Sequence, residues 1–280
     1  MNKTDLIIIG SGPGGYRAAE YAAKNGLSVV MIEKDHIGGT CLNEGCIPTK
    51  TLCHQAKVID TLTDAENFGL SGMSYSIDFP KIMERKETVI YQLKNGIEVL
   101  MQQSGVTVIM GEARLKDEHT VSVGEEEYTA KNIIIATGSH AKMPLIEGID
   151  SDIVITSREL LHIHDIPKRL CIVGAGVIGM EFASVFSSFG SEVTVIEFLK
   201  ESLPVLDSDI AKRLRQTLAK RGVNFYMQSA VKEISEHTVI FERKNKMEQI
   251  EADLVLIATG RGANTDGLHL EEIGIENDRT

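Results

Sequence analysis

The sequence of 280 residues contains little cysteine and no long apolar run. Its first apolar stretch, Leu6 to Ile9, ends at a glycine, so it is too short for the core of a signal peptide. No stretch approaches the ~20 apolar residues of a membrane span. The four cysteines are too few to stabilise a secreted chain of this size through disulfides. We therefore expect a cytoplasmic protein with no membrane partner, in which any disulfide takes part in chemistry.

Positive charge is also scarce: the sequence has 29 lysines and arginines but 40 aspartates and glutamates, which gives a net charge of -11. Such a chain repels a phosphate backbone, which argues against nucleic acid as a partner. The sequence has no CxxC pair or clustered histidines, so no metal site is expected. What the chain does have is 42% hydrophobic residues and 25 glycines, a composition typical of a globular protein rich in tight turns. The length favours two domains.

One pattern occurs twice. Residues 6–15, LIIIGSGPGG, and residues 170–179, LCIVGAGVIG, each read as an apolar strand that runs into a GxGxxG motif and then into helix-forming residues. A second strand follows and ends on an acid, Glu33 in the first copy and Glu197 in the second, at the same distance from the last glycine. Two copies at equal spacing indicate two strand–helix–strand units that bind dinucleotides.

Each part of the motif has a physical role. The first glycine allows a tight turn, the second lets a pyrophosphate approach the backbone, and the third lets the helix pack closely on the strand. The acid accepts hydrogen bonds from an adenosine ribose; the alternative, a solvated carboxylate at a strand end, is disfavoured by the matched spacing. Glu197 would repel a 2′-phosphate and no arginine directly follows it, so the second unit favours NAD over NADP.

The two copies also end in the same way, since residues 132–138 and 254–260 are each predicted to form an apolar strand that ends in Ala-Thr-Gly. The first copy is longer, and a helix at 79–103 with apolar residues at helical spacing accounts for part of the surplus. Short alternating runs predict small antiparallel meanders within 111–129 and 231–242. The predicted fold is α/β, with two Rossmann-like domains, 1–148 and 149–280, joined within residues 143–152.

The remaining distinctive segment, residues 38–50, reads GGTCLNEGCIPTK. Five residues of regular helix rise about 7.5 Å, beyond the ~7 Å limit between the Cα atoms of a disulfide. A Cys41–Cys46 bridge therefore needs a distorted backbone, which Gly45 and Pro48 permit. The alternative is a pair of buried free thiols, and the spacing alone does not decide between the two. The neighbouring dinucleotide motif favours redox chemistry, whereas the other two cysteines, at 53 and 171, are expected to be inert core thiols.

This segment resembles the redox-active disulfide motif of the class I pyridine nucleotide-disulfide oxidoreductases, a family that includes dihydrolipoamide dehydrogenase, glutathione reductase and mercuric reductase. Both glycine motifs, both Ala-Thr-Gly strands and residues 193–207, VTVIEFLKESLPVLD, agree with the dihydrolipoamide dehydrogenases, so the resemblance covers essentially the whole chain. It implies that the two Rossmann-like domains bind FAD and NAD(P), with FAD in the first domain and NAD in the second.

The resemblance also implies roles for single residues. Cys46 would lie beside the flavin, Cys41 would exchange with the disulfide of lipoamide, and Lys50 would lie near the flavin, paired with Glu181. The residues implied at the FAD site are Gly10, Gly12, Pro13, Gly14, Gly15, Glu33, Lys34, Gly39, Thr40, Cys41, Lys50, Ala113, Thr137, Gly138 and Ser139. Those implied at the NAD site are Gly174, Gly176, Val177, Ile178, Gly179, Glu197, Val231 and Gly260.

Members of the family continue beyond the point where this sequence stops. The resemblance implies that a third FAD motif and a dimerisation domain, which carries an acid–base histidine, are absent. We therefore expect a truncated chain with little lipoamide activity, whose eight histidines lie on the surface. The implied substrate is dihydrolipoamide, alone or on lipoyl-bearing subunits of a 2-oxoacid dehydrogenase or glycine cleavage complex, and the full-length family forms homodimers. The alternatives are an enzyme like glutathione or mercuric reductase, or a non-catalytic cofactor-binding fragment.

Overall fold

The structure, a computed structural model, describes residues 2–276. The chain divides into two compact units that are each discontinuous along the sequence. Unit 1 lies within Met1–Ile47, Thr88–His140 and Gly262–Thr280, and unit 2 comprises Pro48–Glu87 and Ala141–Arg261. None of the helices within residues 2–276 is both long and apolar enough to span a bilayer.

These units differ from the predicted domains, 1–148 and 149–280, in which each domain was continuous. The predicted junction at 148 lies inside unit 2, eight residues beyond the boundary at His140. Leu52 and Ile59 of the helix α3 (Cys46–Thr63) pack into the core of unit 2, and Leu268 and Leu270 pack into a core of unit 1. The apolar faces of these segments therefore assign them to units that their position in the sequence did not indicate.

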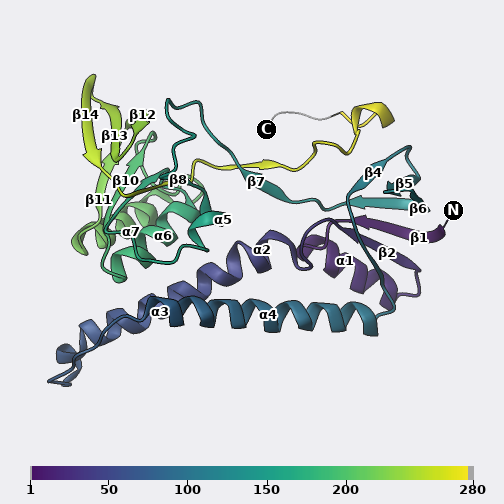
Figure 1. The fold of residues 1–280 in the computed structure, drawn as a ribbon, viewed down its shortest axis with the longest axis horizontal. Helices are drawn as coiled ribbons and strands as arrows, with labels where there is room; N and C mark the ends of the chain where they lie inside the picture. Colours follow the sequence, from purple (N-terminus) through teal and green to yellow (C-terminus); the bar gives the residue numbers. More distant parts are fainter. Residues whose placement is uncertain (1, 277–280) are drawn as a thin grey trace. The chain divides into compact units, whose positions relative to one another are not determined.

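Unit 1 is built on a six-stranded sheet with the order β3-β2-β1-β6-β5-β4 (Figure 1). Its strands are β1 (Asn2–Ile9), β2 (Val29–Glu33), β3 (Thr107–Met110), β4 (Ala113–Leu115), β5 (Thr120–Val123) and β6 (Glu126–Ile135). Side chains of β1 alternate, with Leu6 and Ile8 in the core under α1 (Pro13–Lys24) and Ile7 and Ile9 in the core on the other face. The sheet therefore has two buried faces, and its glycine motif lies at the end of the central strand.

The antiparallel meander expected within 111–129 is confirmed as β4, β5 and the first part of β6. The same strand β6 then continues and pairs parallel with β1 as far as Ile135, directly before the first Ala-Thr-Gly. One strand thus belongs to both the meander and the parallel sheet. The helix expected at 79–103 is confirmed as α4 (Phe79–Gln103).

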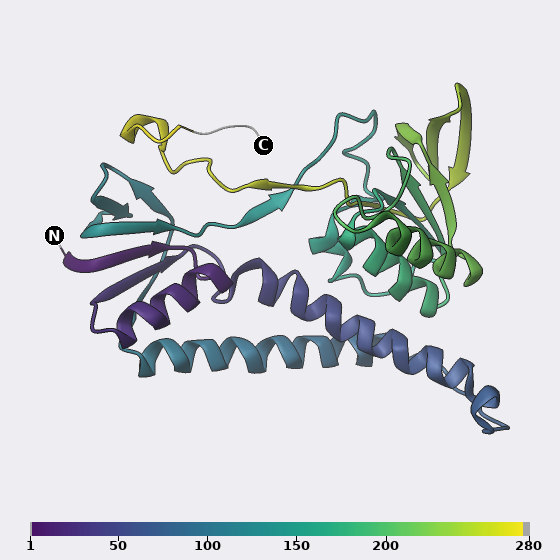
Figure 2. The same cartoon turned by 180° about the vertical axis from the view of Figure 1, so that it is seen from behind.

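Unit 2 repeats this plan with a parallel five-stranded sheet in the order β11-β10-β9-β15-β8. Its strands are β8 (Val154–Ile155), β9 (Arg169–Val173), β10 (Glu192–Glu197), β11 (Asn224–Met227) and β15 (Leu254–Ile257). One face packs on the helices α6 (Val177–Ser188) and α7 (Ser208–Lys220), and the other on the antiparallel sheet of β12 (Ser229–Ser235), β13 (Thr238–Arg243) and β14 (Lys246–Glu251), as Figure 2 shows. The second predicted meander is thereby confirmed.

The remaining elements are short. They are α2 (Gly39–Asn43), α5 (Ser157–Leu160), the paired strands β7 (Ser139–Ala141) and β16 (Arg261–Ala263), and the 3₁₀ turns Ala65–Phe68 and Glu271–Ile273.

A buried lysine supports the core of unit 2. The Lys86 side chain in α4 is 1% exposed, donates to the backbone carbonyl of Leu161, and lies 2.8 Å from the Glu87 carboxylate. Leu161 is the C-terminal cap of α5. The ammonium group thus satisfies a carbonyl at the end of a helix that is too short to be stable by itself.

We expect Lys86→Met to lower the free energy of unfolding by about 2 kcal/mol, because it leaves the Leu161 carbonyl without its donor. The loss is measured as a shift in the urea midpoint. Lys81→Met is the matched control, since Lys81 lies on the same helix, is 78% exposed and pairs with Asp78 at 2.9 Å. Equal effects of the two substitutions would contradict a specific role for Lys86.

Candidate functional site

The first and third glycines of each motif are required by the packing of the protein itself. Gly10 has φ +102°, and a Cβ atom placed there would lie 2.3 Å from the carbonyl oxygen of Ala136. A Cβ atom on Gly15 would lie 1.8 Å from the carbonyl oxygen of Gly10. In unit 2, the corresponding distances at Gly174 and Gly179 are 2.5 and 2.1 Å. The tight turn and the close helix packing expected from the sequence are therefore present in both units.

The second glycine is different, because nothing in the protein demands it. Gly12 and Gly176 have ordinary φ angles of -66° and -73°. A Cβ atom on either would have no protein atom closer than 4.0 Å. Both glycines directly precede a helix, α1 and α6, whose first N–H groups point out of the turn. The space left open over this glycine therefore fits a pyrophosphate that approaches the backbone.

The first acid, Glu33, lies at the end of β2 and is hydrogen-bonded to the neighbouring glycine turn. Glu33 is only 8% exposed, and its Oε2 accepts hydrogen bonds from the backbone N–H of Ser11 at 2.9 Å and the hydroxyl at 2.6 Å. Its Oε1 accepts from the N–H of Asp35 at 2.9 Å. A carboxylate has about four acceptor positions, so it can also accept from a ribose hydroxyl.

The second acid repeats the arrangement in unit 2. Glu197 ends β10, is 8% exposed, and accepts from the N–H of Ala175 at 2.5 Å and of Leu199 at 2.7 Å. Ala175 occupies the same place between two glycines as Ser11 does in unit 1. Neither acid is the solvated strand-end carboxylate considered from the sequence, because both are buried and hydrogen-bonded.

The cysteine segment contains the backbone distortion that a Cys41–Cys46 bridge would need. The helix α2 ends at Asn43 and α3 begins at Cys46, so regular helix is interrupted at Glu44 and Gly45. A Cβ atom on Gly45 would lie 2.9 Å from the carbonyl oxygen of Thr40 and 3.3 Å from the Cα atom of Cys41. Only glycine permits this close approach of the break to the turn that carries Cys41. Both cysteines are free thiols in the structure, Cys41 half-buried and Cys46 exposed.

Glycines also connect this segment to the glycine turn of unit 1. Gly39 has φ +59°, and a Cβ atom there would lie 2.7 Å from the Cα atom of Gly12. The preceding residue, Gly38, has φ +97° and donates its N–H to the carbonyl oxygen of Ser11 at 3.2 Å. The start of α2 is thus in van der Waals contact with the turn that fits a pyrophosphate.

We expect Gly45→Ala to hinder disulfide formation between Cys41 and Cys46, because the added methyl group must displace the Thr40 carbonyl. The equilibrium constant for oxidation should fall about tenfold in a glutathione redox buffer. Gly96→Ala is the control, since Gly96 lies within α4 and a Cβ atom there meets no other atom within 4 Å. An unchanged equilibrium for Gly45→Ala would contradict the role given to this glycine.

An ion pair in unit 2 follows the cysteine segment. Lys50, in the second turn of α3, places its Nζ 2.5 Å from the Oε1 of Glu181 in α6. The structure therefore forms the pair that the family resemblance implied. Burial raises the pKa of the nearby Cys53 thiol, the Glu181 charge raises it further and Lys50 opposes them. Burial raises the pKa of Cys171 to about 12. Both thiols are therefore poor nucleophiles, as expected from the sequence.

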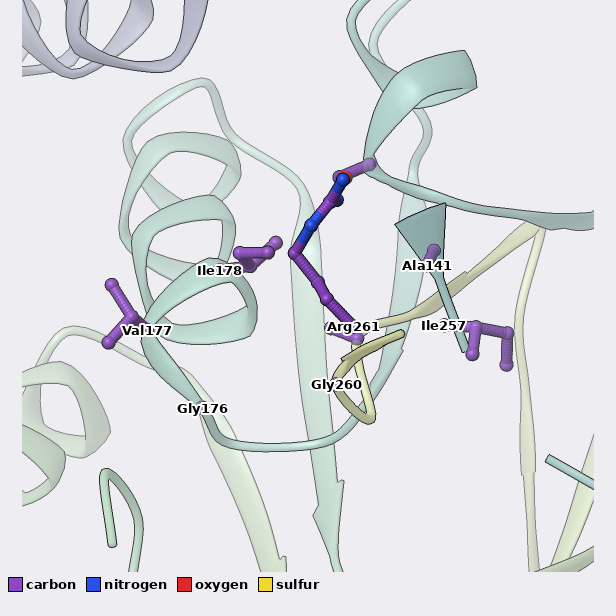
Figure 3. A pocket seen from close by; sticks show the side chains of 9 residues that line it. Ala141, Gly176, Val177, Ile178, Ile257, Gly260 and Arg261 are labelled. Atoms are coloured by element: carbon purple, nitrogen blue, oxygen red, sulfur yellow. The ribbon is translucent and has the colours of Figure 1, made fainter. Parts of the chain in front are cut away.

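A cavity of about 170 Å³ lies where β15 ends and α6 begins (Figure 3). Figure 3 shows the Arg261 side chain reaching from the Gly260 turn past Ile178, with its nitrogen atoms on the side away from Gly176. The lining residues are Ala141, Ser157, Gly176, Val177, Ile178, Ile257, Ala258, Gly260 and Arg261. Four of them, Gly176, Val177, Ile178 and Gly260, are expected from the sequence, whereas Arg261 is not, although it directly follows the second Ala-Thr-Gly.

Val231 is not among the residues that line this cavity; it lies in β12, partly buried against the core under β12–β14. In unit 1, Ala113 is buried at the start of β4, and Thr137 donates its hydroxyl to the carbonyl oxygen of Asn264 at 2.6 Å. Pro13, Gly14, Lys34 and Thr40 are exposed beside the glycine turn or the acid. All eight histidines are exposed, and residues 2–276 contain no cluster of His, Cys, Asp or Glu that could hold a metal ion.

Known proteins resemble the chain over nearly its whole length. It is 44% identical to a dihydrolipoyl dehydrogenase of Acholeplasma laidlawii over 280 residues, which cover 98% of this chain and 83% of that protein. It is 38% identical to the dihydrolipoyl dehydrogenase of Bacillus subtilis, covering 97% of this chain and 61% of that protein. The chain thus spans about three fifths of the length of the Bacillus protein.

A solved structure is also similar. The Cu(II) complex of the HOCl-induced flavoprotein disulfide reductase RclA from Escherichia coli matches with a TM-score of 0.86 and 36% identity, over 100% of this chain and 62% of that one. The family model for pyridine nucleotide-disulphide oxidoreductases matches residues 4–280. Members of this family are oxidoreductases that bind FAD and a pyridine nucleotide. The sequence motifs, the paired glycine turns and these matches agree that the chain belongs to the pyridine nucleotide-disulphide oxidoreductase family.

Proposed function

We propose that this chain carries the FAD, the NAD and the reactive cysteine pair of an enzyme that oxidises dihydrolipoamide to lipoamide. The observation that carries the proposal is the Cys41–Cys46 segment, which is broken at Gly45 and packed through Gly39 on the phosphate-binding turn of unit 1. A structural thiol pair needs neither feature. The dihydrolipoyl dehydrogenase relatives favour this substrate.

The chemistry of the cysteines is thiol–disulfide exchange. A thiolate of dihydrolipoamide attacks the oxidised pair at Cys41, forms a mixed disulfide there, and releases Cys46 as a thiolate. The second thiolate of the substrate then displaces Cys41, so the substrate leaves as a cyclic disulfide and the protein keeps two reduced sulfurs. Bonds and electrons balance, because one disulfide forms for each one that breaks. The exposed position of Cys46 and the half-buried position of Cys41 leave both sulfurs able to exchange.

The reduced pair must then be reoxidised. FAD, when bound, supplies the chemistry that accepts two electrons from a dithiol and passes them as a hydride to a nicotinamide. Gly12 and Glu33 in unit 1 would hold its pyrophosphate and ribose, and the family resemblance gives Lys50, fixed by Glu181, a place near the flavin. A lysine at that position favours negative charge on the reduced ring.

The second nucleotide is proposed to be NAD rather than NADP. Gly176 would admit its pyrophosphate, and Glu197 would accept from the adenosine ribose. A 2′-phosphate would meet the negative charge of a carboxylate that is already held in place by Ala175 and Leu199.

The test is an anaerobic single turnover with the purified yellow protein. In one turnover dihydrolipoamide should reduce the flavin, NAD⁺ should reoxidise it, and NADP⁺ should do so far more slowly, while steady-state turnover of dihydrolipoamide should stay low. Preferential oxidation of the reduced flavin by glutathione disulfide or mercuric ion would instead support a reductase. Purified protein that neither retains nor binds FAD would contradict the catalytic proposal and favour a non-catalytic fragment. Binding to lipoyl-bearing subunits and the oligomeric state can be measured on the same preparation by analytical ultracentrifugation.

A further inference from the structure

The residue between the first two glycines is held from both sides in each unit. In unit 1, Ser11 donates its N–H to the acid that ends β2, and its carbonyl accepts from the N–H of Gly38 at 3.2 Å. In unit 2, Ala175 donates its N–H to the acid that ends β10, and its carbonyl accepts from the N–H of Leu203 at 2.9 Å. Both phosphate-binding turns are therefore fixed by residues that follow the acid in the sequence.

The two units differ in the residue that completes this arrangement. Gly38 has φ +97° and Leu203 has φ +50°, so both lie in the left-handed region. A glycine adopts this conformation at no steric cost, whereas a leucine rarely does. The Leu203 side chain is 4% exposed and packs in the core of unit 2. Unit 2 therefore needs further interactions to hold a leucine where unit 1 has a glycine.

An ion pair between Glu201 and Arg215 lies directly before Leu203 in the loop. Arg215, in α7, places its Nε 2.6 Å from the Oε1 of Glu201 and its Nη2 2.8 Å from the Oε2. The N–H of Ser202, a residue that is 1% exposed, also donates to the Oε1 at 2.9 Å. The Arg215 guanidinium lowers the pKa of Glu201 to about 2, so the pair stays charged at neutral pH. The two residues directly before Leu203 are thus anchored to α7.

We propose that the Glu201–Arg215 pair is a positioning element for the pyridine nucleotide. By anchoring the loop between β10 and α7, the pair keeps Leu203 against the Ala175 carbonyl and preserves the phosphate-binding turn before the nucleotide arrives. A turn that is already ordered spares the nucleotide the entropic cost of ordering it. The inference rests on the proposed binding of NAD in unit 2.

The test is the dissociation constant for NADH, measured by fluorescence titration of the FAD-loaded chain. Arg215→Gln should raise this constant about tenfold, because it removes two charge-assisted hydrogen bonds from the loop. Arg215→Lys keeps the charge but not the bidentate geometry, so it should recover part of the affinity. Reduction of the flavin by dihydrolipoamide should proceed at the wild-type rate, since Cys41 and Cys46 both lie in unit 1.

Arg221→Gln is the matched control. Arg221 is the C-terminal cap of the same helix, and its Nη2 lies 2.8 Å from the Oδ1 of Asp60. The two side chains are 33% and 37% exposed, comparable to 23% and 25% for Arg215 and Glu201. Loss of this pair removes a similar contact away from the glycine turn, so the NADH constant should stay at the wild-type value.

Amide hydrogen exchange gives a second readout without nucleotide. The N–H of Leu203 should exchange faster in Arg215→Gln than in the wild type or in Arg221→Gln. If Arg215→Gln does not fold, Glu201→Gln, which keeps the shape of the side chain, must raise the NADH constant in the same direction.

Equal NADH constants in the wild type and the Arg215 variant, or equal increases in the Arg215 and Arg221 variants, would overturn the inference and leave NAD binding intact. A wild-type chain that binds FAD but no NADH would overturn the proposed function itself, and this inference with it.

Discussion

Cys46→Ser should lose dithiol-driven reduction of the flavin almost completely, by more than about 10³-fold in the single-turnover rate. A single remaining sulfur cannot form the disulfide that the substrate thiolate attacks, so no electrons leave dihydrolipoamide. Cys41→Ser should lose the reaction equally, since exchange begins at that sulfur. The rate is measured by stopped-flow absorbance of the flavin under anaerobic conditions.

The two variants should differ in their spectra. The family resemblance puts Cys46 beside the flavin, so Cys41→Ser should show the long-wavelength absorbance of a thiolate next to an oxidised flavin, and Cys46→Ser should lack it. Cys53→Ser is the control, because burial raises the pKa of the Cys53 thiol and makes it a poor nucleophile. Substantial dithiol-driven reduction in Cys46→Ser would show that electrons take another path.

Gly12→Ala and Gly15→Ala should separate cofactor binding from folding. Gly15→Ala places a methyl group 1.8 Å from the Gly10 carbonyl oxygen, so α1 must move off β1, and the apoprotein should lose about 4 kcal/mol or more of stability. Gly12 has an ordinary φ, and a Cβ atom there would meet no protein atom closer than 4.0 Å. Gly12→Ala should therefore leave the stability of the apoprotein unchanged within about 0.5 kcal/mol. Its methyl group would instead occupy the space proposed for the pyrophosphate, and FAD affinity should fall about 100-fold.

Stability is read from urea unfolding of the apoprotein, and affinity from FAD titration by fluorescence quenching. Gly176→Ala and Gly179→Ala repeat the comparison in unit 2 with NADH as the probe. A Cβ atom on Gly176 would have no protein atom closer than 4.0 Å, whereas one on Gly179 would lie 2.1 Å from the carbonyl oxygen of Gly174. Equal FAD affinity in Gly12→Ala and the wild type would refute the pyrophosphate site. A loss of apoprotein stability in Gly12→Ala would show that the second glycine has a structural role after all.

The sequence predicted those parts of the fold and site that depend on local pattern. The spacing from glycine motif to acid placed Glu33 and Glu197 at strand ends, because alternation and turn chemistry act over a few residues. A disulfide at the CxxxxC spacing would need a break in the helix, and the structure shows one at Gly45. The Lys50–Glu181 pair followed from the family resemblance alone, since nothing local links two residues so far apart.

Features that depend on tertiary packing could not be predicted in this way. The units are discontinuous because the apolar face of α3 packs in the core of unit 2. A helical pattern in the sequence predicts an apolar face, but it does not indicate which core that face packs against. From the sequence, Lys86 would be expected to be exposed like most lysines, yet its side chain is buried and donates a hydrogen bond to the backbone carbonyl of Leu161. Leu203 gives no sign of a left-handed conformation, because its burial and its hydrogen bond to the Ala175 carbonyl depend on the tertiary structure.

The double use of Glu197 limits any redesign of the coenzyme. Replacing this acid with a small or basic residue is the direct route to accepting a 2′-phosphate, but the same carboxylate holds the N–H groups of Ala175 and Leu199. The substitution would therefore loosen the turn proposed to bind the pyrophosphate that both coenzymes contain. A successful switch to NADP must supply a new acceptor for those two N–H groups together with the new cation. Selectivity and affinity are thus coupled through one side chain, and an engineer has to change them together.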